Sequence, residues 1–200
     1  MCMTVATIHA ADETGFVNIV NGTGQDIRLM LDRKVIIDKL APGSMTGGLS
    51  IPVGRASISA TADGLKDASE PITVEKDVSL LAVVGLYTTM KDPPEDVLQI
   101  HAVPYQPHVK KGFSASLIYA GKRALITVKT HNRVIVLEKY KYTDLGSISR
   151  SFSLQSESDK PFVVSFDEPL HYTLVILDAK SGEQTKVLVV PNVKYAKPTF

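Results

Sequence analysis

Hydrophobic and polar residues alternate along most of this chain, and the period of a helix is scarce. Ile27, Leu29 and Leu31, for example, alternate with more polar neighbours. Runs of this kind are separated by Asn-Gly, Pro-Gly and Ser-Gly pairs, which favour turns. Because side chains of a strand point alternately to the two faces of a sheet, each run predicts a strand with one buried face.

Short strands are therefore expected along the whole chain. In the first half we predict them over 15–20, 26–31, 34–38, 45–51, 54–61, 71–75 and 78–87, with "LQIHAV" closing the first sheet. In the second half we predict them over 113–119, 124–129, 133–138, 146–154, 161–165, 170–178 and 184–190. The expected core residues are Ile27, Leu29, Val35, Ile37, Ile58, Val74, Val83, Ile126, Val134, Val136, Val164, Leu174 and Ile176.

Three segments recur in the same order in the two halves. Arg33–Ile36 aligns with Asn132–Ile135, and Glu70–Leu86 aligns with Lys160–Ile176. Between them, Gly43-Ser44 aligns with Gly146-Ser147. Unrelated β-sandwiches share such patterns, but recurrence in order favours a true tandem repeat. We predict an all-β fold of two tandem antiparallel β-sandwich modules, Ig-like or jelly-roll-like, that superpose on each other.

The predicted organisation follows from the turns and prolines. Residues 1–11 are interpreted as the end of a signal peptide, 12–104 as the first module, 105–111 as a linker, 112–193 as the second module and 194–200 as a tail. Pro104 precedes the linker and Pro107 lies within it, and their fixed φ angles favour a stiff, extended connection.

Composition narrows the class of function. The formal net charge is only +1, so no global field attracts nucleic acid, and no apolar run approaches the length of a membrane span. The two halves differ, since 1–104 holds 8 Lys and Arg against 13 Asp and Glu, and 105–200 holds 14 against 8. Packing between two modules of opposite charge would explain this difference, and so would a basic second module that faces an anionic partner.

The first residues, "MCMTVATIHAADE", are apolar and small before they turn polar, and Ile8-His9-Ala10 is similar to the residues that precede a signal-peptidase cut. Export to the periplasm or the cell exterior is therefore expected. Cys2 is the only cysteine and would leave with the signal, so neither a disulfide nor a cysteine metal site is expected in the mature chain.

Candidate catalytic and metal residues are few. The chain has no G-x-S-x-G elbow, and Ser44 in "PGSMTGG" is interpreted as a turn residue. His101 and His108 lack nearby ligands with zinc spacing, and His171 falls in a strand expected to have a solvated face. We therefore predict a protein that is not an enzyme, with no catalytic residues, no metal site and no cofactor.

The best candidate binding patch lies in "EKYKYTD", in the basic half. Alternation in a strand would place Tyr140 and Tyr142 on one face, able to stack on a sugar ring, and Lys139 and Lys141 on the other. Lys129 and Arg133 would add positive charge nearby. The alternative interpretation is an ordinary half-buried hairpin.

The segment from Gly15 to Ala60 resembles the opening of AlgF, the periplasmic accessory protein of alginate O-acetylation, and also the β-sandwich domain of bacterial surface proteins known as DUF4397. The resemblance depends on Phe16-Val17, Asn21-Gly22, Leu40-Ala41-Pro42, Gly43-Ser44 and Pro52-Val53-Gly54. It covers 14–87 well and 112–190 weakly, and its motifs are turns and core positions.

The resemblance implies a non-catalytic accessory or adaptor protein of the cell envelope, in O-acetylation or export of an exopolysaccharide. Its implied partners are an envelope acyltransferase complex or an anionic polysaccharide. The alternative is a surface adhesion or carbohydrate-binding module with no link to acetylation.

Overall fold

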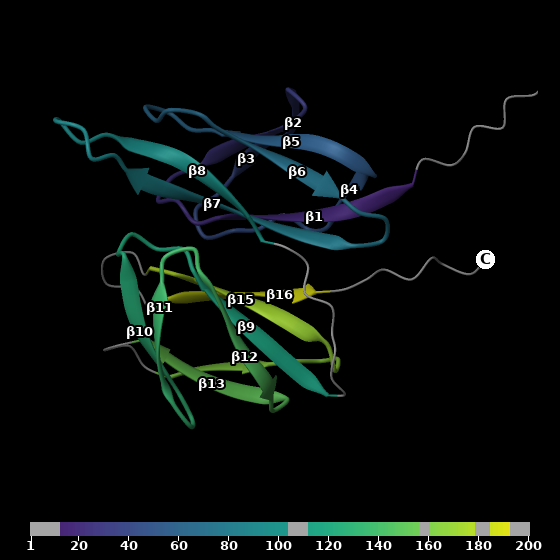
Figure 1. The fold of residues 1–200 in the computed structure, drawn as a ribbon, viewed down its shortest axis with the longest axis vertical. Coiled ribbons are helices and arrows are strands. Elements are labelled where there is room, and N and C mark those ends of the chain that lie inside the picture. The colour runs from purple at the N-terminus through teal and green to yellow at the C-terminus, as the bar shows by residue number, and fades with distance from the viewer. Residues whose placement is uncertain (1–12, 104–111, 157–160, 179–184, 193–200) are drawn as a thin grey trace, which may run out of the picture.

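The computed structural model describes residues 13–103, 112–156, 161–178 and 185–192. These ranges contain β-strands and no helix (Figure 1). Module 1 contains β1 (Thr14–Asn21), β2 (Ile27–Leu31), β3 (Lys34–Leu40), β4 (Leu49–Pro52), β5 (Gly54–Thr61), β6 (Ala68–Val74), β7 (Ser79–Thr88) and β8 (Asp96–Val103). Module 2 contains β9 (Phe113–Tyr119), β10 (Leu125–Thr130), β11 (Val134–Glu138), β12 (Tyr142–Ile148), β13 (Ser151–Ser156), β14 (Phe162–Ser165), β15 (His171–Leu177) and β16 (Lys186–Asn192). The expected signal segment, linker and tail lie outside the described residues.

Each module is a sandwich of two four-stranded sheets. Module 1 has an inner sheet of order β4-β1-β7-β8 and an outer sheet of order β3-β2-β5-β6. Module 2 has an inner sheet of order β12-β9-β15-β16 and an outer sheet of order β11-β10-β13-β14. The two inner sheets face each other, so the molecule is a stack of four sheets (Figure 1). Strands pair antiparallel except β1 with β7 and β9 with β15.

The two modules have the same strand order, which confirms the tandem repeat. Equivalent hydrogen bonds fix the residue correspondence: Phe16 N–H donates to Val78 O, and Ser114 N–H donates to Leu170 O, where the parallel pairs begin. Val35 and Val134 are equivalent, as the sequence alignment predicts, because each pairs with the same position of the preceding strand.

The other two aligned segments are in the right order but in the wrong register. Gly43 corresponds to Tyr140, since their N–H groups donate to Asn21 O and Tyr119 O, and both residues have positive φ angles, 64° and 59°. Gly146 lies instead at a β-bulge in β12. The alignment of Glu70–Leu86 is displaced by two residues, because Ser79 is the residue that matches His171.

Two predicted strands differ from the structure. The run 146–154 is two strands, because the chain leaves the inner sheet after β12 and enters the outer sheet at β13. The run 45–51 forms a strand only from Leu49, while Met45 makes an isolated bridge to Val20. The prediction that "LQIHAV" closes the first sheet is confirmed by β8.

Most predicted core residues are buried between the sheets of their own module. Val35, Val134 and Val136 were predicted as core residues and are 52%, 63% and 58% exposed. They point outward from β3 and β11, while their neighbours Ile135 and Leu137 pack inward. A one-residue error in register moves every side chain to the other face, and a run such as "VIVL" is apolar on both faces.

A third apolar cluster joins the modules. It consists of Val20, Leu81, Val83, Ile118, Ala120, Val175, Leu177 and Val190. Val83, predicted as a core residue, is buried here instead of inside its own sandwich. The two modules are therefore held together by a continuous apolar interface between the inner sheets.

Equivalent residues meet across this interface. Gly22 and Ala120 occupy equivalent positions, and a methyl group on Gly22 would lie 3.4 Å from Ala120 Cβ. Gly85 of module 1 lies against Tyr140 of module 2. Leu177 is equivalent to Gly85 and Gly43 is equivalent to Tyr140, and these two residues also lie against each other. Contacts repeated with the roles exchanged characterise a two-fold interface. The chain is therefore built like a symmetric dimer whose two halves are joined in one polypeptide.

Candidate functional site

A groove of about 660 Å³ opens at one end of module 2. It lies where the turn between β10 and β11 approaches β12 and the connection from β12 to β13. Its lining residues are Thr130, His131, Asn132, Arg133, Leu145, Ser147, Ile148, Ser149, Ser151, Phe152, Ser153 and Val163. The groove therefore combines one fixed positive charge, several hydroxyl groups and an apolar floor.

Arg133 supplies the positive charge, and the backbone holds its side chain in place. Its guanidinium donates a hydrogen bond to Leu145 O at 2.9 Å, while Thr130 Oγ1 accepts from Arg133 N–H at 3.3 Å in the turn below. Arg133 forms no ion pair within the described part of the chain. Since a guanidinium has five N–H donors, most of them remain available for an anionic group.

Hydroxyl groups and apolar side chains complete the groove. Ser147 and Ser153 make no side-chain hydrogen bond to any residue that the structure describes, so their hydroxyls are available to a polar ligand. Leu145, Ile148 and Phe152 contribute apolar surface, of which Leu145 is buried. Small-molecule sites commonly combine mostly apolar walls with a few oriented polar groups.

The six binding residues predicted from the sequence do not form one patch. Arg133 lines the groove. Lys129 lies close to it in the outer sheet, because it pairs with Val134, the residue after Arg133, and its side chain is exposed. The other four lie beyond the far end of β11, a strand of five residues and therefore roughly 17 Å long. A single ligand contact that combines all six is not supported by this arrangement.

Lys139 and Tyr140 face module 1. Tyr140 has a positive φ angle and occupies a turn, so the predicted strand alternation is wrong at this residue. Its ring stacks on His101 with centroids 3.8 Å apart, and Lys139 Nζ donates to Leu86 O at 2.5 Å. Burial raises the pKa of the Tyr140 hydroxyl and lowers the pKa of Lys139. These residues therefore hold the modules together and do not offer a ring to a sugar.

Lys141 and Tyr142 complete the predicted set. Lys141 is exposed and pairs with Glu138 at 2.5 Å. Tyr142 packs against the interface cluster, and its hydroxyl lies 2.9 Å from His171 Nε2. Neither tyrosine of "EKYKYTD" is therefore a freely exposed stacking platform.

A buried polar network on β9 and β15 was missed from the sequence. His171 Nδ1 lies 2.9 Å from Ser114 Oγ, and its Nε2 lies 2.9 Å from Ser116 Oγ. Tyr142 completes the network through hydrogen bonds to Ser116 and His171. His171 is 7% exposed, so the expectation of a solvated face is wrong there. No residue in "PLHYTL" signals burial, because the polar partners come from strands far away in sequence.

The sequence also contains a pattern that corresponds to the groove. In "GSISRSFSL" serines occupy every second position, Ser147, Ser149, Ser151 and Ser153, with apolar or basic residues between them. Such alternation predicts a row of hydroxyls along one face of an extended chain. The break between β12 and β13 within this run brings the row to the rim of the groove.

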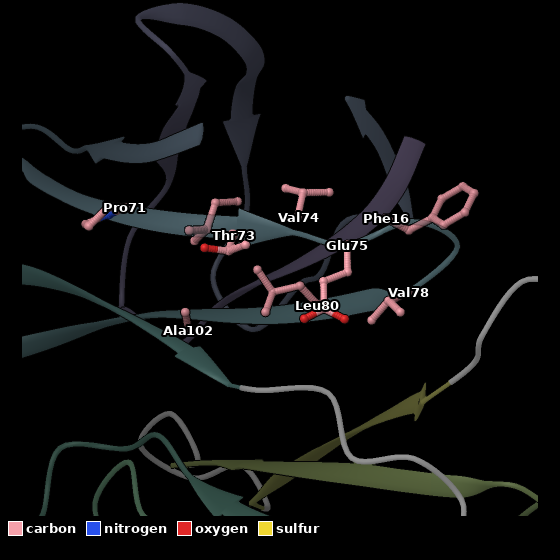
Figure 2. Close-up of a pocket in the computed structure, with 9 residues that line it drawn as sticks. Phe16, Pro71, Thr73, Val74, Glu75, Val78, Leu80 and Ala102 are labelled. Carbon is pink, nitrogen blue, oxygen red and sulfur yellow. The ribbon is translucent and has the colours of Figure 1, made fainter. Parts of the chain in front are cut away.

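Module 1 has a smaller hollow of different chemistry. It is a cavity of about 310 Å³. In Figure 2 the Glu75 carboxylate lies beside Val78 and Leu80, with Phe16 at one side. Its other lining residues are Pro71, Ile72, Thr73, Val74 and Ala102. No cationic side chain lines this cavity, so a carboxylate ligand would meet the negative charge of Glu75 uncompensated.

No group of three His, Cys, Asp or Glu side chains in the described ranges is placed to hold a metal ion. Those ranges also contain no helix that is long and apolar enough to cross a membrane. No model of a known protein family matches the chain, and no curated protein matches it. The groove of module 2 is therefore the candidate functional site.

Proposed function

We propose that this protein is a non-catalytic accessory protein of the cell envelope, and that it binds an anionic polysaccharide in the groove of module 2. The observation that carries the proposal is Arg133, fixed by Leu145 O at the rim of a hydroxyl-lined, apolar-floored groove. A uronate or similarly charged sugar presents the matching groups, a carboxylate, several hydroxyls and an apolar ring face.

Several features support a role in binding rather than in catalysis. Among the described residues, Ser114 and Ser116 each place a hydroxyl 2.9 Å from a ring nitrogen of His171, but both serines are buried and their strand β9 has no following helix. The groove itself has a single exposed histidine, His131, and its lining contains no carboxylate to act with it. We therefore place the function in recognition and expect no turnover of acetyl esters.

Location outside the cytoplasm belongs to the same proposal. It is supported by the signal-like composition of 1–11 and by the resemblance of 14–87 to AlgF-like accessory proteins. The basic balance of 105–200 is also consistent with an anionic partner for module 2. An acyltransferase complex of the envelope is the protein partner that this resemblance suggests.

The test is calorimetric titration of the full chain with anionic and neutral oligosaccharides of equal length. Arg133→Gln should weaken binding of the anionic chain by about tenfold or more, because a hydrogen bond to a charged group contributes about 1.5–3 kcal/mol. Arg55→Gln is the matched control, an exposed arginine of module 1. Raising the salt concentration should weaken the wild type more than Arg133→Gln.

Equal affinity for neutral and anionic chains would contradict an anionic ligand and favour a general carbohydrate-binding or adhesion module. An equal loss in Arg133→Gln and Arg55→Gln would remove the groove from the proposal.

A further inference from the structure

The edge strands of the two modules differ in how well they are protected against pairing with another chain. Exposed strand edges carry unpaired N–H and C=O groups, and proteins commonly block them with proline, bulges or charged side chains. Here β4, β6 and β16 contain Pro52, Pro71 and Pro191, and β12 has a bulge before Gly146. The free edge of β8 is partly covered by Lys66, whose carbonyl accepts a hydrogen bond from Leu98 N–H at 3.2 Å.

β3 is blocked in a different way. Its register with β2 shifts at two points, and ion pairs join its Asp38 and Lys39 to Arg28 and Asp26 at 2.9 Å each. β14 has only four residues. β11 contains no proline, and its pairing with β10 is regular along the whole strand. Its one charged residue, Glu138, is the last of the strand and pairs with Lys141, so the stretch from Val134 to Leu137 is not blocked.

The backbone of β11 presents its free groups at defined residues. Thr130 N–H donates to Arg133 O, and Lys139 N–H donates to Ala124 O, so odd-numbered residues face β10. Successive residues of a strand direct their N–H and C=O groups to opposite sides. The groups of Val134 and Val136 therefore point away from the sheet. They have no hydrogen-bond partner among the residues that the structure describes.

The side chains at these two positions are apolar and exposed. Val134 is 63% exposed and Val136 is 58% exposed. Together with Ile135 they form the palindrome Val-Ile-Val, so an antiparallel copy centred on Ile135 would place valine opposite valine.

We propose that two copies of this protein associate by pairing their β11 strands antiparallel, with Val134 of each copy opposite Val136 of the other. In this register both Val134–Val136 pairs exchange two backbone hydrogen bonds. Arg133 lies opposite Leu137. The alternative register, centred on Val136, would place Arg133 opposite Lys139, and two like charges directly opposite are unfavourable. The two outer sheets then form one continuous sheet across the dimer.

This arrangement has a consequence for the groove. Antiparallel pairing places the β10–β11 turns, each with its Arg133, at opposite ends of the joined strands. A dimer would then present two grooves to one long polymer, and a second contact on the same chain raises the overall affinity. The association itself does not depend on what the groove binds, so it is measured without any sugar.

Sedimentation equilibrium of the full chain, from micromolar to submillimolar concentration, tests the proposal. The average mass should rise from 21.7 kDa toward twice that value. Val134→Lys with Val136→Lys should keep the protein monomeric, with an unchanged circular dichroism spectrum because both side chains are exposed. Val35→Lys is the matched control at the equivalent, protected edge of module 1, and it should associate like the wild type.

The register is tested by cysteine cross-linking in a Cys2→Ser background. Val134→Cys with Val136→Cys should form an interchain disulfide between the two positions, whereas either substitution alone should link poorly. A wild type that stays monomeric at all concentrations would overturn the proposal. The edge of β11 would then be a candidate binding site for an extended peptide of another protein. Association unchanged by the two lysines would overturn it as well.

Discussion

Gly85 lies within β7 at a point where no side chain can be accommodated. A Cβ atom at this position would lie 1.6 Å from the Tyr140 hydroxyl oxygen, which packs onto the Gly85 backbone from module 2. The glycine is required by this close approach and not by its backbone conformation. A residue of module 1 is thus determined by the packing of module 2.

Gly85→Ala should therefore weaken the module interface. The added methyl group must displace Tyr140 from its stack on His101, and overpacking of this kind costs about 1–3 kcal/mol. Urea unfolding of the variant should show this loss. Gly47→Ala is the control, because a methyl group there meets no atom within 4 Å. Equal stability of the two variants would contradict the described contact.

At the scale of a strand, Val134 and Leu137 show that a sequence pattern can locate a strand without determining which of its faces is buried. The pattern places a strand at 133–138 correctly, but it assigns the wrong face, because "VIVL" offers a branched or long apolar side chain to both sides. The structure buries Leu137 completely and exposes Val134. Alternation fixes a register only where one face is polar, as at Ile27 and Leu29, which were predicted correctly.

Substitutions in β11 can test this register. Leu137→Ala should destabilise the protein by about 2–5 kcal/mol, the usual cost of removing a buried leucine side chain. Val136→Thr should change the free energy of unfolding by less than about 0.5 kcal/mol, because the side chain lies on the surface. Chemical denaturation of both variants decides the matter, and the reverse order would restore the register predicted from the sequence.

The candidate site was only partly predictable for a related reason. Arg133 could be named because a basic turn in a basic half is visible in the sequence. Its companions Ser147 and Phe152 belong to β12 and β13, and they approach Arg133 only because the chain changes sheets between those strands. Tyr140 and Tyr142 were predicted to contact a ligand, but they pack at the interface between the modules. The sequence could not show this, because the packing of one module on another leaves no pattern in the local sequence.

At the scale of the whole molecule, the interface between the modules contains a partly buried histidine, His101. His101 of β8 is stacked on Tyr140, and its Nε2 has no hydrogen-bond partner among the residues described. Burial lowers the pKa of His101, and the nearby charge of Lys139 lowers it further. Asp96 and Asp178 interact with Lys139 and partly offset its charge.

Acid should therefore weaken this interface. The folded state holds His101 neutral while the unfolded chain takes up a proton below its usual pKa of about 6.5. The contribution of neutral His101 to the free energy of unfolding is therefore fully present above about pH 6.5. It is lost as the pH falls from there toward the lower pKa of the folded state. His101→Phe keeps a ring on Tyr140 but cannot titrate. Its thermal unfolding temperature should fall less than that of the wild type between about pH 7.5 and pH 5.5. Parallel curves for the two proteins would contradict this role of His101.

The central claim is that the groove at Arg133 is the ligand site, and amide chemical-shift mapping tests it most directly. On titration of the ¹⁵N-labelled chain with an oligouronate, the chemical-shift changes should concentrate at Thr130–Arg133 and along Ser147–Ser153. The amides around the module 1 cavity, from Thr73 to Leu80, should not move. Chemical-shift changes confined to that cavity, or none at all, would contradict a ligand site at Arg133.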